Sequence, residues 1–397
     1  MTKQGVWDLQ DVRDKALKGD WNYQTPGGPF TLWAWGNNSN PATRSGMLGL
    51  NDIVQRSSPT QVGTDQNWNN MGASNFTTIA TKTDGTLWVW GSNGTYGQDY
   101  GKLGLNAPNP TSISSPTQIG TDTNWGRAYS WDQLSAAVKT NGELYVWGYG
   151  EEGAIGENSR TNRSSPVQVP GTNWSTADGH LQGAANNAAY AIRTDGTLWS
   201  WGINRQNGQL GLNSLQDKSS PTQIGTATNW SWVRATGQAV WAVNTDGQLW
   251  AWGYNENGRL GQNGSIAIDA KISSPTQIPG TTWSQVGGRT NVLALKTDGT
   301  LWGWGTNNGG LGLNDLAERS SPTQIGTDTD WAKVNLDGTG AIKNNGTIWV
   351  WGGNTYGKLG LNQPDGTKYS SPVQLPGSYD SVISGVSRPQ LATKPIE

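Results

Sequence analysis

The side chains that could carry out chemistry are few in this chain, and they do not form a catalytic set. His180 is the only histidine and there is no cysteine, which excludes a histidine-based triad, a histidine cluster and a thiolate metal site. Glu151, Glu152 and Glu157 could suggest a cation site, but they lack the alternating carboxylates of a calcium-binding loop. No pair of carboxylates stands out at a spacing that indicates a glycosidase. The sequence therefore predicts no catalytic residue, no metal site and no cofactor.

Ligand binding by aromatic side chains is the better supported chemistry. Aromatic rings with Asn and Gln nearby could stack on sugars, and several occur outside the repeated tryptophan motif described below. The same residues could instead cover the edges of sheets. Trp131 and Trp232 are two such aromatic residues. The candidate binding residues are Tyr96, Tyr100, Tyr149, His180 and Tyr254, with His180 in an inserted loop.

The composition excludes several classes of partner. The formal net charge is −2 and only 14% of the residues are charged, so the composition shows no excess of basic residues that would attract nucleic acid or an anionic membrane. No run approaches the roughly 18 apolar residues of a membrane span, and the first residues lack the apolar core of a signal peptide. The chain has 24 Trp and 56 Gly but only two Phe. Because a buried Trp removes about 150–250 Å² from water, the repeated Trp residues are predicted to form the core.

Most of the Trp residues lie in one motif, LWxWG, which occurs seven times with small changes. The copies recur roughly every 50 residues, and a fixed motif at such a period indicates a repeat architecture. They occupy residues 32–36, 87–91, 144–148, 198–202, 249–253, 301–305 and 348–352.

Each repeat is predicted to contain four antiparallel strands, as residues 68–118 illustrate. A first strand starts at Trp68, and a second strand ends at Asp84-Gly85, a dipeptide that favours a tight two-residue turn. The motif strand follows this turn. After a loop rich in Gly and Asn, a Ser-Ser-Pro-Thr-Gln segment at 114–118 makes the fourth strand, where its proline suits a sheet edge.

The motif places apolar residues on both faces of its strand. Alternate side chains of a strand point to opposite sides, so both Trp of LWxWG point one way while Leu, x and Gly point the other. A sheet that is apolar on both faces suits packing between two similar sheets. The predicted fold is therefore an all-β, seven-bladed β-propeller of four-stranded blades over residues 30–397, with a linear β-solenoid as the alternative.

The two ends of the chain predict how the ring closes. The first motif copy has no strands before it within its unit, whereas residues 379–385 and 390–394 read as the first two strands of a unit with nothing after them. The missing halves complement each other. We therefore expect the C-terminal strands to join N-terminal strands at 31–36 and 57–62, so that no sheet edge stays free.

Residues 1–29 lie outside the repeat and are predicted to form an N-terminal anchor. Apolar residues recur at helical spacing in residues 5–18, with Gly19 as the stop. We expect a short amphipathic helix whose apolar stripe needs a partner surface; the alternative is that it packs back on its own domain. The proposed anchor residues are Val6, Trp7, Leu9, Val12, Leu17 and Trp21.

The repeat resembles a known family. The segment Lys-Thr-Asp-Gly-Thr-Leu-Trp-Gly-Trp-Gly at 296–305, followed by Gly-Leu-Gly-Leu at 310–313, is similar to the regulator of chromosome condensation repeat, and the similarity spans about residues 30–395. The resemblance implies a propeller. It implies little about function, because propellers of this family serve as exchange factors, chromatin binders, ligase modules and scaffolds.

Loop lengths are predicted to separate the two faces of the ring. Connections between the first and second strands, and between the third and fourth, should emerge on one face, and they carry all the large variation in length. They include 37–56, 92–113, 254–272 and an insertion around 178–184. Loops that vary on a repeated scaffold are the usual place for recognition, although neutral drift would leave the same pattern. The N-terminal segment should emerge on the opposite, constant face.

The preferred hypothesis is a non-enzymatic virion structural protein, either a phage tail fibre or a capsid decoration. Residues 5–21 are similar to the short starts of tailed-phage structural proteins, and the cysteine-free, Asn/Thr/Gly-rich composition is similar to that of phage appendage proteins. The resemblance implies that the protein is located in the virion and that residues 1–29 bind other virion proteins. It also implies that the loop face binds a host-surface protein or glycan. The alternatives are a cellular lectin or protein-interaction scaffold, located in the cytoplasm, and a guanine nucleotide exchange factor.

Overall fold

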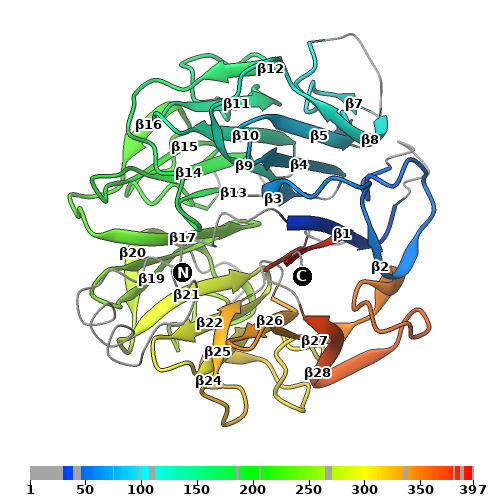
Figure 1. The fold of residues 1–397 in the computed structure, drawn as a ribbon. Helices are drawn as coiled ribbons and strands as arrows, with labels where there is room; N and C mark the ends of the chain where they lie inside the picture. Colours follow the sequence, from blue (N-terminus) through cyan, green and yellow to red (C-terminus); the bar gives the residue numbers. More distant parts are fainter. Residues whose placement is uncertain are drawn as a thin grey trace, which may run out of the picture.

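The protein is described by a computed structural model that places residues 30–38, 46–74, 76–95, 98–106, 112–131, 133–184, 187–204, 207–263, 271–334, 338–378, 381–384 and 389–395. Within these ranges the chain forms β-strands and two single-turn 3-10 helices. The sheets stand around a common axis, with the first and last strands adjacent (Figure 1). The predicted all-β propeller class is confirmed. In the described ranges no helix has the length and apolar character needed to cross a membrane.

Five sheets contain four antiparallel strands each. Their strands are β9 (Trp125–Trp131), β10 (Leu134–Lys139), β11 (Leu144–Gly148) and β12 (Arg163–Gln168); β13 (Leu181–Ala184), β14 (Ala188–Ile192), β15 (Leu198–Gly202) and β16 (Lys218–Gln223); β17 (Trp230–Thr236), β18 (Ala239–Asn244), β19 (Leu249–Tyr254) and β20 (Lys271–Ile278); β21 (Trp283–Gly288), β22 (Asn291–Lys296), β23 (Leu301–Gly305) and β24 (Arg319–Gln324); and β25 (Trp331–Val334), β26 (Gly340–Lys343), β27 (Thr347–Gly353) and β28 (Lys368–Ser378).

A sixth sheet contains eight strands in the order β29-β30-β1-β3-β4-β5-β8, with β2 paired to β1. Its strands are β1 (Phe30–Gly36), β2 (Arg56–Gln61), β3 (Trp68–Ala73), β4 (Thr77–Lys82), β5 (Leu87–Ser92), β8 (Ser112–Gln118), β29 (Ser381–Ser384) and β30 (Pro389–Pro395). The other elements are a small hairpin of β6 (Gly94–Thr95) and β7 (Gln98–Asp99), and the helices η1 (Glu256–Gly258) and η2 (Thr355–Gly357).

The prediction of seven separate four-stranded blades is wrong, because the described strands form six sheets of four or more strands. The reason is a pairing between the first two repeats, in which Phe30 of β1 is the antiparallel partner of Trp68 of β3. This pair joins β29, β30, β1 and β2 to β3, β4, β5 and β8 in a single sheet. The number of motif copies therefore exceeds the number of separate sheets. The predicted N-terminal helix falls at 1–29, outside the described residues.

The expected pairing of the chain ends is confirmed. Strands β1 and β30 run antiparallel through seven residue pairs, from Phe30 opposite Pro395 to Gly36 opposite Pro389. The other edge of β1 pairs with β2, and β30 also pairs with β29. The first and last parts of the chain therefore share one sheet, which protects both edges of β1.

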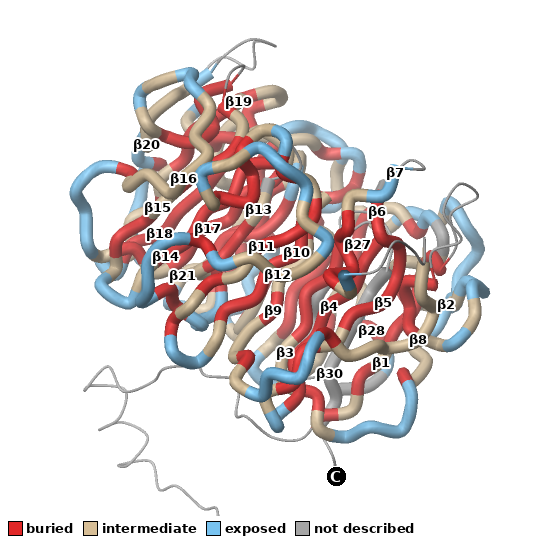
Figure 2. The backbone as a smooth tube through the Cα atoms, turned by 90° about the horizontal axis from the view of Figure 1, so that it is seen from above, coloured by how far each residue is buried: buried red, intermediate tan, exposed pale blue. Residues whose placement is uncertain are grey.

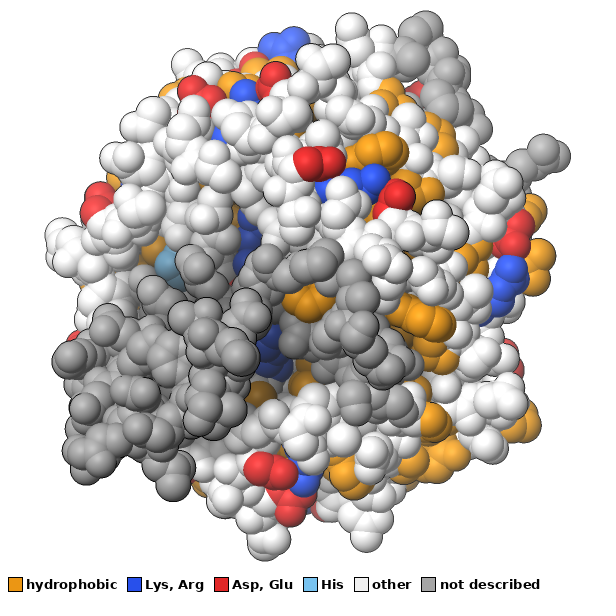
Figure 3. Space-filling view, in the orientation of Figure 1, with side chains coloured by type: hydrophobic (Ala, Val, Ile, Leu, Met, Phe, Trp, Pro, Cys, Tyr) orange, Lys and Arg blue, Asp and Glu red, His pale blue; other side chains and the backbone are white. Residues whose placement is uncertain are grey.

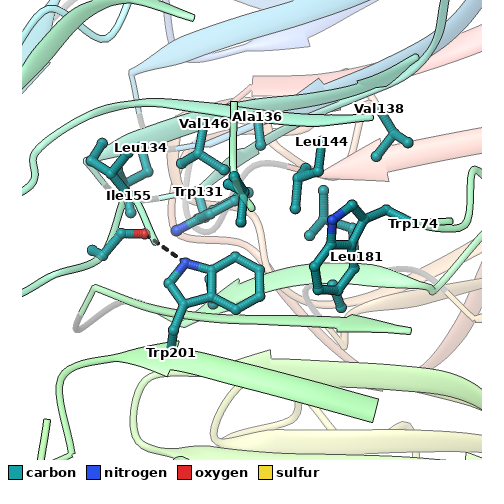
Figure 4. Packing of buried hydrophobic residues seen from close by; sticks show 14 residues of the cluster. Trp131, Leu134, Ala136, Val138, Leu144, Val146, Ile155, Trp174, Leu181 and Trp201 are labelled. Atoms are coloured by element: carbon teal, nitrogen blue, oxygen red, sulfur yellow. Dashed lines mark hydrogen bonds between the residues drawn. The ribbon is translucent and has the colours of Figure 1, made fainter. Parts of the chain in front are cut away.

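The LWxWG motif is buried on both faces of its strand. In β15, Leu198, Ser200 and Trp201 are fully buried and Trp199 is half-buried. The indole Nε1 of Trp201 donates a hydrogen bond of 3.0 Å to the backbone oxygen of Ala154, in the connection between β11 and β12 (Figure 4). The equivalent bonds run from Trp90 to Met47, Trp147 to Lys102, Trp252 to Gln209, Trp304 to Arg259 and Trp351 to Gly310. In these six copies the second Trp thus ties its repeat to the preceding repeat; five of the bonds join neighbouring sheets, and that of Trp90 lies within the eight-stranded sheet.

The Gly-x-Leu-Gly segment of the repeat, which reads Gly-Ala-Ile-Gly at 153–156, provides the surface on which this indole packs. Gly156 has a φ of +85°, and a Cβ built on it would lie 2.6 Å from Nε1 of Trp201. A side chain there would have both an unfavourable backbone conformation and a steric clash. The repeated glycine is therefore explained by the close approach of one sheet's backbone to the next sheet's tryptophan.

A cation lies between two aromatic rings near one end of five sheets. The Lys82 ammonium is 4.8 Å from the ring centroid of Trp68 and 3.8 Å from that of Trp88, and it pairs with Asp65 at 2.8 Å. The equivalent cations are Lys139, Arg193, Lys296 and Lys343. In the remaining sheet, Asn244 ends the corresponding strand, β18.

Replacing Lys82 with methionine should lower the free energy of unfolding by about 1–2 kcal/mol. The change keeps the aliphatic stem but removes the cation–π contacts and the ion pair with Asp65. Denaturant unfolding followed by tryptophan fluorescence would measure it. Lys271→Met, on an exposed residue of β20, is the matched control and should have almost no effect. Equal losses in the two variants would contradict the expectation.

Candidate binding surfaces

The ring has two faces, which differ in the connections that form them. The turn face carries the tight turns between the second and third strands of the sheets, such as Asp195-Gly196 between β14 and β15. The loop face carries the longer connections between the third and fourth strands. Buried residues follow the strands, and exposed residues concentrate in the connections (Figure 2).

Two of the predicted tyrosines meet on the loop face. The rings of Tyr100 and Tyr149, which belong to neighbouring sheets, form a T-shaped pair with centroids 5.0 Å apart. The Tyr149 hydroxyl donates to the Glu151 carboxylate at 3.0 Å. Burial, together with this hydrogen bond, raises the pKa of Tyr149 to about 12. These contacts hold both rings against the protein.

The other predicted aromatic residues do not join this pair. Tyr254 lies at the end of β19, with the guanidinium carbon of Arg259 5.5 Å from its ring centroid. Trp131 and Trp232 are only 5% and 9% exposed, so their ring faces are inaccessible to a sugar. Tyr96 lies outside the described residues.

Exposed apolar side chains on the loop face are scattered. Ile53, Val54, Leu215 and Leu316 lie on three different connections between third and fourth strands. Single exposed apolar residues are common on soluble proteins. They therefore do not by themselves define a binding surface.

The inserted segment emerges on the turn face, not on the loop face as predicted. Trp174 bridges Arg193 beside the Asp195-Gly196 turn, whereas Leu181 pairs with Ala191. Residues 175–180 therefore leave the sheet before β13, at its turn end. The other five large sheets have only a register shift here, between Trp68 and Asn70, Trp125 and Arg127, Trp230 and Trp232, Trp283 and Gln285, and Trp331 and Lys333. The spacing of the repeats in the sequence showed that this unit has extra residues. It did not show at which end of the first strand these residues leave the sheet.

A cavity of about 740 Å³ opens on the turn face, between the first strands of the sheets. Figure 3 shows Lys and Arg side chains inside the central hollow of the ring. All six large sheets contribute to the described lining, for example through Asn70, Arg127, Asp178, Trp232, Gln285 and Lys333. We call this the axial cavity.

Hydrogen bonds between neighbouring sheets hold the walls of the axial cavity. The Asn70 side-chain oxygen accepts a bond of 2.9 Å from the backbone N–H of Ala128. The Gln285 side-chain oxygen accepts one of 3.2 Å from Val334. These amides therefore connect β3 to β9 and β21 to β25, so the cavity is framed by regular structure.

Arg127 and Asp178, both in the lining of the axial cavity, form an ion pair that joins β9 to the inserted segment. The Tyr129 hydroxyl adds a bond of 3.3 Å to the backbone oxygen of Ala177. Burial acts to lower the pKa of Arg127, but the charge of Asp178 raises it overall. Burial also raises the pKa of Tyr129. At neutral pH Arg127 is therefore charged and Tyr129 is protonated.

His180 ends the same inserted segment, on the face opposite to the predicted tyrosines. Its Nδ1 is buried and has no hydrogen-bond partner in the described structure. Burial lowers the pKa of His180, and the nearby Arg127 adds to this, although a hydrogen bond with the backbone of Ser231 and the charge of Asp178 act against it. The predicted binding residues therefore do not form one site.

The lowered pKa of His180 predicts that folding stability depends on pH. The unfolded chain binds the proton first, near pH ~6.5, so the free energy of unfolding should fall as pH drops from there towards the folded-state pKa. Urea unfolding of the wild type and of His180→Gln at several pH values between about 7.5 and 5 would test this. The wild type should lose more stability than the variant across this range. Parallel curves would contradict it, and the comparison is clean because the chain has a single histidine.

Apart from Trp232, one of the aromatic residues outside the repeated motif, the residues that line the axial cavity were not among those predicted, although the sequence contains a signal for them. Asn70, Arg127, Trp232, Gln285 and Lys333 each lie two residues after the Trp that opens the first strand of a repeat. Residue types differ at this position, so the pattern carries no recognisable motif. Its meaning depends on knowing that these strands surround the axis.

Two further predictions concern other kinds of site. In the ranges that the structure describes, no group of three or more His, Asp or Glu could hold a metal ion. The anchor residues Val6, Trp7, Leu9, Val12, Leu17 and Trp21 all fall outside those ranges.

Comparison with known families confirms the resemblance of the repeat. The family described as "Regulator of chromosome condensation (RCC1) repeat" matches residues 141–176, 195–239, 246–288 and 345–387. The human E3 ubiquitin-protein ligase HERC2 is 28% identical over 245 residues, which are 58% of this chain and 5% of the ligase. The mitochondrial RCC1 domain-containing protein RUG3 of Arabidopsis thaliana is 28% identical over 242 residues, 59% of this chain and 53% of that protein. The chain thus matches about half of one relative and a small part of the other.

A solved structure supports the same fold. The crystal structure of Prp20p from Saccharomyces cerevisiae aligns with a TM-score of 0.75 and 18% identity, covering 93% of this chain and 92% of that chain. The similarity at this identity concerns the fold. Prp20p itself is described as binding Gsp1p and histones.

Proposed function

We propose that this chain, in which four segments match the RCC1 repeat, is a non-enzymatic protein-interaction module that receives its partner at the turn face. The axial cavity carries this proposal. Most of its described lining residues have polar side chains, all six large sheets contribute to it, and the inserted segment forms part of the lining. Recognition residues placed on loops around a rigid scaffold are a common arrangement in binding proteins.

Two observations support a binding role over catalysis. The described lining of the axial cavity holds one carboxylate and no histidine, so it lacks the acid–base pair that general catalysis requires. Among proteins that share the fold, Prp20p is described as binding proteins. HERC2 is a ligase, but the match covers only 5% of its length, so its activity does not extend to this chain by similarity.

Site-specific crosslinking would test the proposal. Because the chain has no cysteine, Thr176→Cys introduces a single thiol on an exposed residue of the axial cavity, and Arg160→Cys introduces one on an exposed residue of the loop face. Each variant would be labelled with a photoactivated crosslinker and exposed to an extract of its native source. A specific partner should crosslink at residue 176, and unlabelled protein should compete for it.

The two positions separate the possible results. Crosslinking at 160 without crosslinking at 176 would place recognition on the loop face and overturn the proposal. The absence of any competed crosslink at 176 would overturn it as well.

A virion role is a second candidate, favoured by the similarity of residues 5–21 to tailed-phage structural proteins. It predicts that the chain cosediments with virus particles and that deletion of residues 1–29 abolishes this. Undiminished incorporation of the deletion variant would contradict an anchor in that segment. The same experiment bears on location, in the virion or in the cytoplasm.

A further inference from the structure

The described lining of the axial cavity has more basic than acidic groups. Its charged residues are Arg127, Lys333 and Asp178. Arg234 lies two residues beyond the cavity residue Trp232 on β17, and its Nη1 donates to the Gln182 side chain at 2.8 Å. Among the described residues, the lining and the neighbouring Arg234 thus contain three cations and one carboxylate, an arrangement that favours an anionic ligand.

The one carboxylate of the described lining comes from the inserted segment and is the more accessible member of its ion pair. The Asp178 side chain is 52% exposed, whereas that of Arg127 is 16% exposed. Arg127 donates to Asp178 through Nη2, while its Nε–H is buried without an acceptor in the described structure. The two-point pairing that a guanidinium makes with a well-placed carboxylate is therefore not formed.

We propose that the axial cavity binds acidic side chains of a protein partner, and that Asp178 is an internal competitor that pairs with Arg127 until the partner arrives. This inference rests on the proposed function and adds the chemistry of the partner. Arg127 of β9 and Lys333 of β25 receive the partner's carboxylates. A cavity of about 740 Å³ lies in the size range of pockets for small ligands, so it admits side chains of an extended segment but not a folded domain.

The exchange involves ion pairs only, without a covalent step. Asp178 is half-exposed, so its release into water costs little, and the partner's carboxylate takes over its bond to Arg127. Because the partner's carboxylates are attracted to Arg127 and Lys333 near the protein surface, where salt screens charges, binding should weaken as salt concentration rises.

Peptide binding to the full-length protein provides the test, with a fluorescein-labelled, C-amidated peptide of alternating Glu and Gly as the probe. Three controls carry the same label: the Gln/Gly peptide, a neutral peptide with a free C-terminal carboxylate, and oligo-dT. Fluorescence anisotropy at two salt concentrations would give the Kd of each. We expect the Glu peptide to bind, more tightly at low salt, and the three controls not to.

Two substitutions with opposite effects make the test specific. Arg127→Gln should weaken binding at least about 10-fold, since it removes a charged hydrogen-bond donor. Asp178→Asn should tighten binding up to about 5-fold, as expected for removal of a half-exposed competing ion pair. A merely structural role of the pair would weaken binding in both variants. Arg160→Gln, on the loop face, is the control substitution and should leave the Kd unchanged.

Thermal unfolding would establish that each variant is folded, and Lys333→Gln gives a second loss-of-binding variant if Arg127→Gln does not fold. The inference is overturned if the Glu peptide fails to bind Asp178→Asn, or if Asp178→Asn does not tighten binding. It is also overturned if binding follows the free C-terminus or oligo-dT. A partner crosslinked at residue 176 together with no Glu-peptide binding would overturn this inference alone and leave the protein-interaction function standing.

Discussion

Replacing Trp201 with alanine is expected to lower the free energy of unfolding by about 3–5 kcal/mol, the range for removing a large buried aromatic side chain. Trp201 is fully buried, and it packs among residues of the preceding sheet such as Leu134 and Val146 (Figure 4). The truncation leaves a cavity between two sheets and removes the donor to Ala154. Urea unfolding followed by circular dichroism would measure the loss.

Two further variants separate the causes of this loss. Trp201→Phe keeps most of the ring but leaves the Ala154 carbonyl without its donor, so it should cost about 1–3 kcal/mol. Trp199→Ala removes the half-buried Trp of the same motif copy and should cost less than Trp201→Ala, because less area leaves water when that side chain is buried. A loss for Trp199→Ala equal to that for Trp201→Ala would contradict the role assigned to the second Trp.

Linking the two ends of the chain by a disulfide is expected to stabilise the protein by about 2–4 kcal/mol. Thr31 of β1 lies directly opposite Lys394 of β30, so the double substitution Thr31→Cys and Lys394→Cys places two thiols across the closing pair. The natural chain has no cysteine, so no other disulfide can form within it. Denaturant unfolding with and without reductant would measure the gain.

The register of the closing strands provides the control. Thr31→Cys combined with Ala392→Cys puts the second thiol two residues away from the position opposite Thr31, and this pair should oxidise poorly. Efficient oxidation of the mismatched pair, or no stabilisation by the matched one, would show that the ends are not held in this register.

Much of the architecture could be predicted from the sequence because the repeat is local and regular. Alternating apolar positions in LWxWG indicated a strand buried on both faces, and Trp201 with its bond to Ala154 shows the sheet-to-sheet packing that this requires. Complementary half-repeats at the chain ends indicated the pairing of β1 with β30. Both inferences, the buried motif strand and the pairing of the chain ends, followed from the repeat pattern alone.

The number of separate sheets and the identity of the candidate site were decided by the tertiary structure. The pair between Phe30 and Trp68 merges two repeats into one sheet, and no local pattern specifies such a contact between successive repeats. Loop length placed the candidate residues on the loop face, whereas the insertion that carries Asp178 and His180 leaves on the turn face.

The sequence by itself determined the repeated strand unit, the tryptophan core and the joining of the chain ends, because side-chain periodicity dictates which faces of a strand must be buried. Only the tertiary structure decided that Arg127, Asp178 and Lys333 share one cavity. These three residues lie far apart in the chain; Arg127 and Lys333 occupy the same ordinary strand position in their repeats, whereas Asp178 lies in the inserted segment. Closure of the ring brings the positions together, so the charge of the cavity is a property of the assembled sheets and of no single one.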